Sequence, residues 1–88
     1  MTRREVVVQN ELGLHLRSAS TFVRTASRFR SQIRVATALV PPVDGKSILG
    51  LVTLGAATGE RLVITADGPD EAEAVEALAG LVNAHFGE

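Results

Sequence analysis

Short apolar runs along the chain predict four strands. Residues 5–9 are rich in β-branched side chains, and residues 32–36 alternate between apolar and polar positions, as a half-buried strand does. Residues 61–66 form an apolar run that is typical of a central strand. Residues 37–43 make a poorer strand, because two consecutive prolines remove backbone donors and so indicate the sheet edge. A turn is expected at residues 44–45, which are Asp-Gly.

Three helices are predicted between and after these strands. Over residues 16–28 the apolar side chains recur with helical spacing. Ser47 is the expected N-cap of a short helix that runs to about Leu54. The last helix opens with Asp70 and Glu73 at the spacing of a capping box. Its predicted buried stripe is Val75, Leu78, Ala79 and Val82.

The element order is therefore β-α-β-β-α-β-α, with no repeat or linker. A chain of 88 residues, 45% of them hydrophobic, is expected to form one domain over residues 1–88. Two layers accommodate these elements best. The predicted fold class is α+β: an open-faced β-sandwich whose four-stranded, mostly antiparallel sheet is covered on one face by three helices.

Composition narrows the possible functions. The chain has no cysteine and two histidines, which argues against a structural metal site, and no cofactor is expected. No uncharged run approaches the roughly 18 residues of a membrane span, so we expect a cytoplasmic monomer without membrane insertion.

Charge is unevenly distributed along the chain. Residues 1–46 hold eight basic and three acidic side chains, whereas residues 47–88 hold one basic and seven acidic ones. Such a dipolar chain favours an oriented encounter with a charged partner. An arginine-rich nucleic-acid module is a weaker alternative, because there is no Trp or Tyr on which bases could stack.

A titratable side chain lies at the first junction between strand and helix. His15 is followed two residues later by Arg17, and Gly13 precedes it. The first N–H groups of a helix lack partners within the helix and favour anions, phosphate above all. A neutral imidazole there could act as a nucleophile towards phosphorus. A lone loop histidine is more often a bystander, so this reading needs support from its neighbours.

Two further features permit a structural and a functional interpretation. The row of Arg17, Arg24 and Arg28 is either a solvated helix face or a basic docking face that continues from His15. Ser47 is either an N-cap alone or also a site where phosphate is tolerated. A helix of about two turns cannot bury all its apolar residues, so some should remain exposed as a partner site. The candidates for that exposed patch are Ile48, Leu49 and Val52.

Six short motifs follow one another along the chain: Asn10-x-x-Gly13-Leu14-His15-x-Arg17, Phe22-Val23, Gly45-Lys46-Ser47-Ile48-Leu49-Gly50-Leu51, Thr53-Leu54, Gly59 and Gly68-x-Asp70-Glu71. With these motifs the chain resembles HPr, the histidine phosphocarrier family of the bacterial phosphoenolpyruvate-dependent phosphotransferase system. The resemblance runs nearly end to end and implies an open-faced β-sandwich.

The resemblance also implies roles for individual residues. His15 would accept a phosphoryl group on Nδ1 from phospho-enzyme I and pass it to enzyme IIA-type proteins, and Arg17 would contact that group. Ser47 matches the serine phosphorylated by HPr kinase/phosphorylase. The short helix and Arg24 would belong to the surface that binds partners. Such a protein is a phosphotransfer protein rather than a self-sufficient enzyme.

Two positions depart from the family pattern Ala-Arg-Pro-Ala after the histidine. Leu16 adds bulk, and Ser18 supplies a backbone N–H and a hydroxyl that proline lacks. These departures leave open a regulatory paralogue, either nitrogen-type or controlled through Ser47, that does not serve sugar transport. In such a binder His15 could stay idle.

We expect Ser18 to give the phosphoryl group an extra donor and to slow its onward transfer. Ser18→Pro should then make the phosphohistidine more labile. The measurement is the rate of hydrolysis and of onward transfer in both proteins, and equal rates would contradict the hypothesis.

Overall fold

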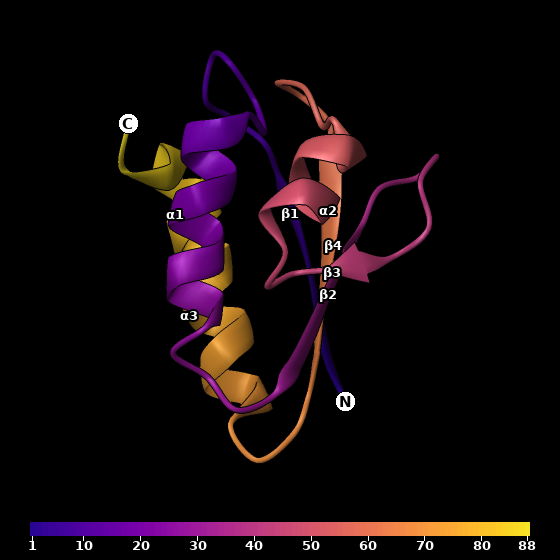
Figure 1. The fold of residues 1–88 in the computed structure, drawn as a ribbon, viewed down its shortest axis with the longest axis vertical. Helices are drawn as coiled ribbons and strands as arrows, with labels where there is room; N and C mark the ends of the chain where they lie inside the picture. The colour runs from indigo at the N-terminus through magenta and orange to yellow at the C-terminus, as the bar shows by residue number, and fades with distance from the viewer.

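Four strands form a single antiparallel sheet in the order β1-β4-β2-β3, and three helices cover one of its faces (Figure 1). The computed structural model describes all 88 residues. The elements are β1 (Thr2–Val7), α1 (Leu16–Ala26), β2 (Gln32–Ala36), β3 (Val43–Asp44), α2 (Ile48–Leu54), β4 (Arg61–Asp67), α3 (Glu71–Asn83) and a closing 3-10 turn, η1 (His85–Gly87). The predicted α+β open-faced sandwich and its element order are confirmed.

Strand β4 lies at the centre of the sheet, as its apolar sequence predicts. It pairs with β1 and β2, so that Ile64 is opposite Arg4 on one side and Val35 on the other. Alternate residues of β4, namely Leu62, Ile64 and Ala66, are fully buried. The two-residue period of the strand therefore gives the sheet one apolar face.

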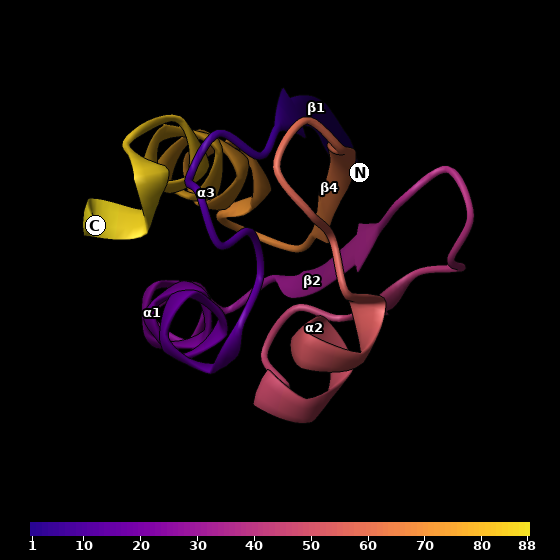
Figure 2. The same ribbon diagram turned by 90° about the horizontal axis from the view of Figure 1, so that it is seen from above.

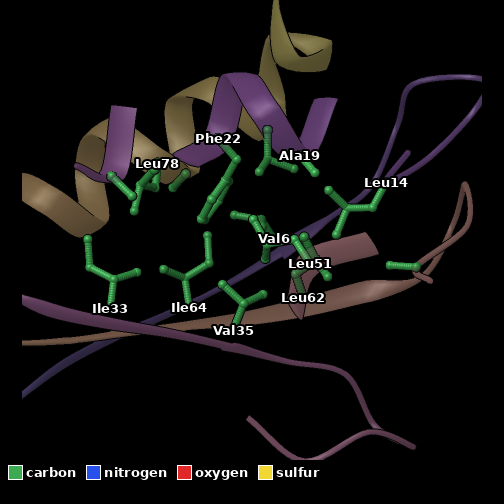
Figure 3. Packing of buried hydrophobic residues seen from close by; sticks show 14 of the residues in the cluster. Val6, Leu14, Ala19, Phe22, Ile33, Val35, Leu51, Leu62, Ile64 and Leu78 are labelled. Carbon is green, nitrogen blue, oxygen red and sulfur yellow. The ribbon is translucent and has the colours of Figure 1, made fainter. Parts of the chain in front are cut away.

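That apolar face packs against α1 and α3 (Figure 2). Phe22 of α1 and Leu78 of α3 lie over Ile33 and Ile64 of the sheet (Figure 3), and all four are almost completely buried. The core contains 20 buried hydrophobic residues and extends to Leu14, in the loop before α1. Leu14, the residue directly before His15, thus anchors this loop to the core. None of the helices has the length and apolar character needed to span a membrane.

The first strand begins earlier and ends earlier than the predicted range of 5–9. It starts at Thr2 and stops at Val7. Its first four residues are polar on both faces of the strand, so no apolar pattern marks them, yet all four pair with β4. Val8 follows the strand yet still exchanges backbone hydrogen bonds with Gly59 and Glu60, at 2.8 and 2.9 Å.

The predicted strand at residues 37–43 is wrong over most of its length. Only Val43–Asp44 pairs with β2. The Thr37 hydroxyl accepts hydrogen bonds from the backbone N–H groups of Leu39 and Val40, at 3.3 and 3.0 Å, so the chain bends away directly after β2. This local bond and the prolines that follow oppose strand pairing. The edge position of β3 is as predicted.

Two helix and turn boundaries also differ slightly from expectation. Helix α1 ends at Ala26, before Arg28, whose N–H turns to the carbonyl of Thr25 at 3.2 Å. Asp44 ends β3 and begins the expected turn, because its Oδ1 accepts the N–H of Lys46 at 2.9 Å.

The predicted capping box of the last helix does not form. Asp70 occupies the N-cap position of α3 but makes no side-chain cap. Its carboxylate instead accepts the hydroxyl of Ser31 at 2.5 Å and the N–H groups of Arg30 and Ser31 at 2.8 and 2.9 Å. These bonds, that of the Ser31 hydroxyl first, hold the pKa of the Asp70 carboxyl below its usual value. Asp70 therefore links the start of α3 to the residues directly before β2. The spacing between Asp70 and Glu73 could not indicate this partner, because Arg30 and Ser31 lie far away in the sequence.

The neighbouring carboxylate ties α3 to the first strand. Glu71 accepts the hydroxyl of Thr2 at 2.6 Å and the N–H of Gly68 at 3.3 Å, and it lies 2.8 Å from the amino group of Met1. The hydrogen bonds from the Met1 amine, Thr2 and Gly68 lower the pKa of Glu71 from 4.5 to about 2. Because its pKa is lower in the folded state, Glu71 stabilises the fold above about pH 4.5, and this stabilisation is lost as the pH falls towards 2.

We therefore predict that Glu71→Gln lowers stability at neutral pH and flattens the decline in stability between about pH 4.5 and 2. Urea unfolding measured across this pH range checks the prediction. Glu73→Gln is the matched control, because Glu73 lies in the same first turn and should retain the wild-type slope. Parallel pH profiles for Glu71→Gln and the wild type would contradict it.

Candidate functional site

His15 caps the N-terminus of α1. Its backbone is extended, with φ −131° and ψ −175°, and its side-chain Nδ1 accepts the backbone N–H of Arg17 at 3.3 Å. In return, the Ser18 hydroxyl accepts the N–H of His15 at 2.9 Å. The His15 side chain also accepts the N–H of Ser18, which completes a capping box, whereas the N–H of Leu16 has no acceptor within the protein. The imidazole thus takes the place of the usual capping oxygen, and the N–H of Leu16 remains free beside it.

The loop before His15 is held by close backbone packing. Gly13 has φ +68°, and a Cβ on it would collide with the carbonyl oxygen of Ala56. The N–H of Leu14 donates to that same oxygen at 2.8 Å, and the Leu14 side chain is buried. Because both Gly13 and Leu14 are fixed against the end of α2, His15 is presented at a defined point.

The Ser18 side chain forms hydrogen bonds with the loop before α1 and not with solvent. Its side chain is completely buried, and its hydroxyl donates to the carbonyl of Gly13 at 2.9 Å while accepting the His15 N–H. The hypothesis that Ser18 gives a phosphoryl group an extra donor stays a prediction. In this structure the hydroxyl proton of Ser18 is engaged by the Gly13 carbonyl, and its backbone N–H faces the His15 side chain in the capping box.

A carboxylate from the far end of the chain completes the surroundings of His15. Glu88 Oε2 lies 2.8 Å from His15 Nε2, and Glu88 Oε1 accepts a bond from Asn10 Nδ2 at 3.1 Å. The side chains of His15 and Glu88 are 27% and 22% exposed, so the contact is partly shielded from water. The sequence reasoning missed Glu88, because 73 residues separate it from His15 and no local pattern links them.

Glu88 is kept ionised by its partners. Desolvation works to raise the pKa of its carboxyl, but hydrogen bonds from Asn10 and His15 and the charges of His15 and Arg17 outweigh it. The pKa of Glu88 is therefore lowered. An anionic carboxylate therefore lies against the His15 ring at neutral pH.

These contacts assign different roles to the two ring nitrogens. Nδ1 accepts a backbone N–H, so in the neutral ring the proton resides on Nε2 and faces Glu88. The Nδ1 lone pair, which here accepts the Arg17 N–H, is directed towards the helix start, where the backbone N–H groups and the helix dipole favour an anion. A nucleophilic nitrogen and an anion site therefore coincide.

Basic side chains border an open depression next to His15. It is lined by Leu12, His15, Leu16, Arg17, Ser20 and Arg24. Arg17 and Arg24 are exposed, and neither forms a salt bridge with any carboxylate of the chain. Arg24 makes one long bond to the Thr21 hydroxyl, at 3.5 Å. Both guanidinium groups are thus open to an external anion or an acidic partner.

Ser47 caps a different helix and does not join the His15 network. Its hydroxyl accepts the N–H of Gly50 at 3.1 Å, which confirms the predicted N-cap of α2. The predicted exposure of that helix's apolar residues is also confirmed: the exposed fractions are 37% for Ile48, 77% for Leu49 and 38% for Val52. Nowhere do three His, Cys, Asp or Glu side chains gather in a way that could hold a metal ion.

Comparison with known proteins identifies similar chains over the full length. The family model described as "PTS HPr component phosphorylation site" matches residues 2–84. The phosphocarrier protein HPr of Neisseria meningitidis serogroup A is 46% identical over 88 residues, covering 100% of this chain and 98% of that protein.

Solved structures agree in both fold and sequence. HPr-C-His from Thermoanaerobacter tengcongensis superimposes with a TM-score of 0.94 at 42% identity, covering 100% of this chain and 98% of the other. Crh, the catabolite repression protein of Bacillus subtilis, gives a TM-score of 0.76 at 38% identity, covering 97% of each chain.

Removal of the Ser18 hydroxyl tests how the site is held. Ser18→Ala leaves the buried His15 N–H and Gly13 carbonyl without their partner, so we expect a loss of about 1–3 kcal/mol in the free energy of unfolding. Urea denaturation measures it. Ser20→Ala in the same helix is the control and should change stability by less than about 0.5 kcal/mol. A Ser18→Ala protein as stable as the wild type would show that this bond does not hold the loop.

Proposed function

The chain belongs to the HPr family, the phosphocarriers of the phosphotransferase system, and on that basis we propose that it carries a phosphoryl group on Nδ1 of His15. The observation that supports this assignment is the position of Nδ1. The nitrogen caps α1 beside the free N–H group of Leu16 and faces the N–H groups of Arg17 and Ser18. A phosphoryl group on Nδ1 would lie at the positive end of the helix dipole.

Arg17 is proposed to contact the phosphoryl group. Its guanidinium is exposed, has no carboxylate partner, and lines the same depression as His15. A planar fork of donors matches phosphate oxygens in geometry and charge. The N–H of Ser18 supplies a further donor that proline would lack. Comparison of Ser18→Pro with Ser18→Ala separates the effect of this N–H from that of the hydroxyl.

A phosphocarrier needs partners to complete its chemistry. We propose phospho-enzyme I as donor and enzyme IIA-type proteins as acceptors. The proposed contact surface joins the basic side chains of Arg17 and Arg24 to the apolar patch of Ile48, Leu49 and Val52. The relay would operate in the cytoplasm. We propose that the protein does so as a monomer.

Ser47 supports a second candidate function. It lies half-buried at the start of α2, directly before the exposed apolar patch. A phosphate there would change the charge of that surface while still suiting a helix N-terminus. The similarity to Crh, which is named for catabolite repression, supports a regulatory role. We propose that such regulation would act through phosphorylation of Ser47 by a kinase of the HPr kinase/phosphorylase type, as an alternative to sugar transport.

We predict that incubation with phosphoenolpyruvate and a bacterial enzyme I adds one acid-labile phosphoryl group and that His15→Ala abolishes it completely. The measurement is the intact mass before and after brief acid treatment. Ser47→Ala is the matched control and should gain the same group as the wild type. A wild-type chain that takes up no phosphate, or a His15→Ala chain that takes it up equally, would contradict the carrier assignment.

A further inference from the structure

Two exposed leucine side chains bracket His15 in the sequence. Leu12 lies in the turn before the histidine, and Leu16 is the first residue of α1. Each is 69% exposed, although leucine is among the residues that folding most often buries. A single exposed leucine needs no explanation, but two on either side of one reactive side chain indicate a shared role.

Both leucines line the depression that also contains His15 and Arg17. Neither belongs to the hydrophobic core, so their side chains contribute little to the fold. The Arg17 guanidinium in this depression has no carboxylate partner. The depression therefore combines a nucleophilic nitrogen, a free cation and two apolar side chains.

An open depression is a poor place for an ion pair, because water weakens it. The attraction between two charges is about four times stronger at the effective dielectric constant of about 20 near a protein surface than at the value of about 80 in water. A donor must bring its phosphorus within bonding distance of Nδ1 of His15, so it necessarily covers this depression. Apolar side chains of that donor would bury Leu12 and Leu16 and expel the water around the transferred group.

We propose that Leu12 and Leu16 form an apolar rim that seals the phosphoryl site when phospho-enzyme I docks, and that the rim selects donors with apolar side chains opposite both leucines. The inference rests on the proposed function. Arg24 lines the same depression and joins the rim to the proposed contact surface. Leu16 acts twice at this site, because its free backbone N–H favours the anion and its side chain contacts the donor.

Sealing favours transfer over loss of the group to water. In transfer, the Nδ1 lone pair bonds to phosphorus, and the bond from phosphorus to the donor breaks, its electron pair staying with the donor. In hydrolysis, a water oxygen bonds to phosphorus and the Nδ1–phosphorus bond breaks, its pair returning to Nδ1. Inorganic phosphate then leaves with both protons of the water molecule. The rim excludes water only in the complex, because the depression is open in the free protein.

The first test measures transfer from phospho-enzyme I over a range of concentrations of this protein. Leu12→Ala and Leu16→Ala should each raise the concentration that gives half the limiting rate about tenfold, the loss expected when part of a buried leucine side chain is removed. Leu39→Ala is the matched control. Leu39 is 92% exposed, but its loop between β2 and β3 protrudes on the side away from α1 (Figures 1 and 2). Rim variants that behave like Leu39→Ala would overturn the proposal.

A second substitution separates apolar contact from bulk. Leu16→Asn keeps nearly the size of leucine but is polar. If Leu16 acted only as an obstacle, Leu16→Ala would transfer faster than the wild type and Leu16→Asn would match it. The rim predicts weaker docking in both variants, with Leu39→Asn unchanged. Faster transfer by Leu16→Ala would therefore overturn the rim.

The second test counts the phosphate that is lost to water. With phosphoenolpyruvate and enzyme I, the double variant of Leu12→Ala and Leu16→Ala, folded by circular dichroism, should release several times more inorganic phosphate per transferred group than the wild type. The release by enzyme I alone is subtracted. The isolated phosphorylated variant should hydrolyse at the wild-type rate. No increase during transfer, or the same increase in the isolated protein, would contradict sealing in the complex.

Failure of the rim can be distinguished from failure of the carrier function. If the wild type takes up phosphate on His15 and the leucine variants dock and transfer equally well, only the rim is overturned. If the wild type takes up no phosphate from enzyme I, the carrier function fails and the rim fails with it.

Discussion

The start of α1 is the constraint on which the site depends. A helix leaves its first N–H groups without partners, and this chain meets that need with an imidazole nitrogen in place of a hydroxyl or carboxylate oxygen. Because His15 is the cap, its ring must lie over the helix start, with Nδ1 directed at the backbone donors. The left-handed Gly13 and the buried Ser18 hydroxyl follow from this requirement, since both fix the loop that delivers the ring. The hydrogen bond that stabilises the start of α1 is therefore the same one that orients the ring of His15.

The network around the ring also fits the proposed role, in which the site would relay phosphate without hydrolysing it. Glu88, the carboxylate that contacts the ring, binds Nε2, on the side away from the helix start, and Asn10 holds its other oxygen. In this position it cannot serve as a base for a water molecule attacking at Nδ1. The depression beside the ring presents the side chains of Arg17 and Arg24, which stabilise negative charge but accept no proton. On the proposed function, the site would hold a phosphoryl group and leave its removal to a partner.

Much of this arrangement can be predicted from the sequence, because it depends on contacts between residues that are close together in the chain. The period of two in β4 and the N-cap at Ser47 each depend on residues close together in the chain, and the seam at His15 combines a strand end with a helix start. The contacts that local patterns do not predict join residues that are far apart in the sequence. The spacing of Asp70 and Glu73 predicts a local capping box, but the partner of Asp70 is Ser31, 39 residues away. The contact between Glu88 and His15 could not be predicted, because it depends on the left-handed turn at Phe86. Residues 37–43 failed for another reason: the Thr37 side chain competes for backbone donors that strand pairing would need.

Helices α1 and α2 both begin with unpaired N–H groups, but a histidine caps α1 and a serine caps α2. This difference separates the two positions that are proposed to carry phosphate. Ser47 caps α2 through its hydroxyl, and a phosphate in its place would still present oxygen acceptors and negative charge to a helix start. Such a change would reinforce α2 rather than unfold it. The end of α2, not its start, adjoins the His15 loop, through the bond from the N–H of Leu14 to the carbonyl of Ala56. A charge on Ser47 could therefore reach His15 only weakly through the fold. Its direct effect would fall on the patch of Ile48, Leu49 and Val52, and hence on which partner can approach.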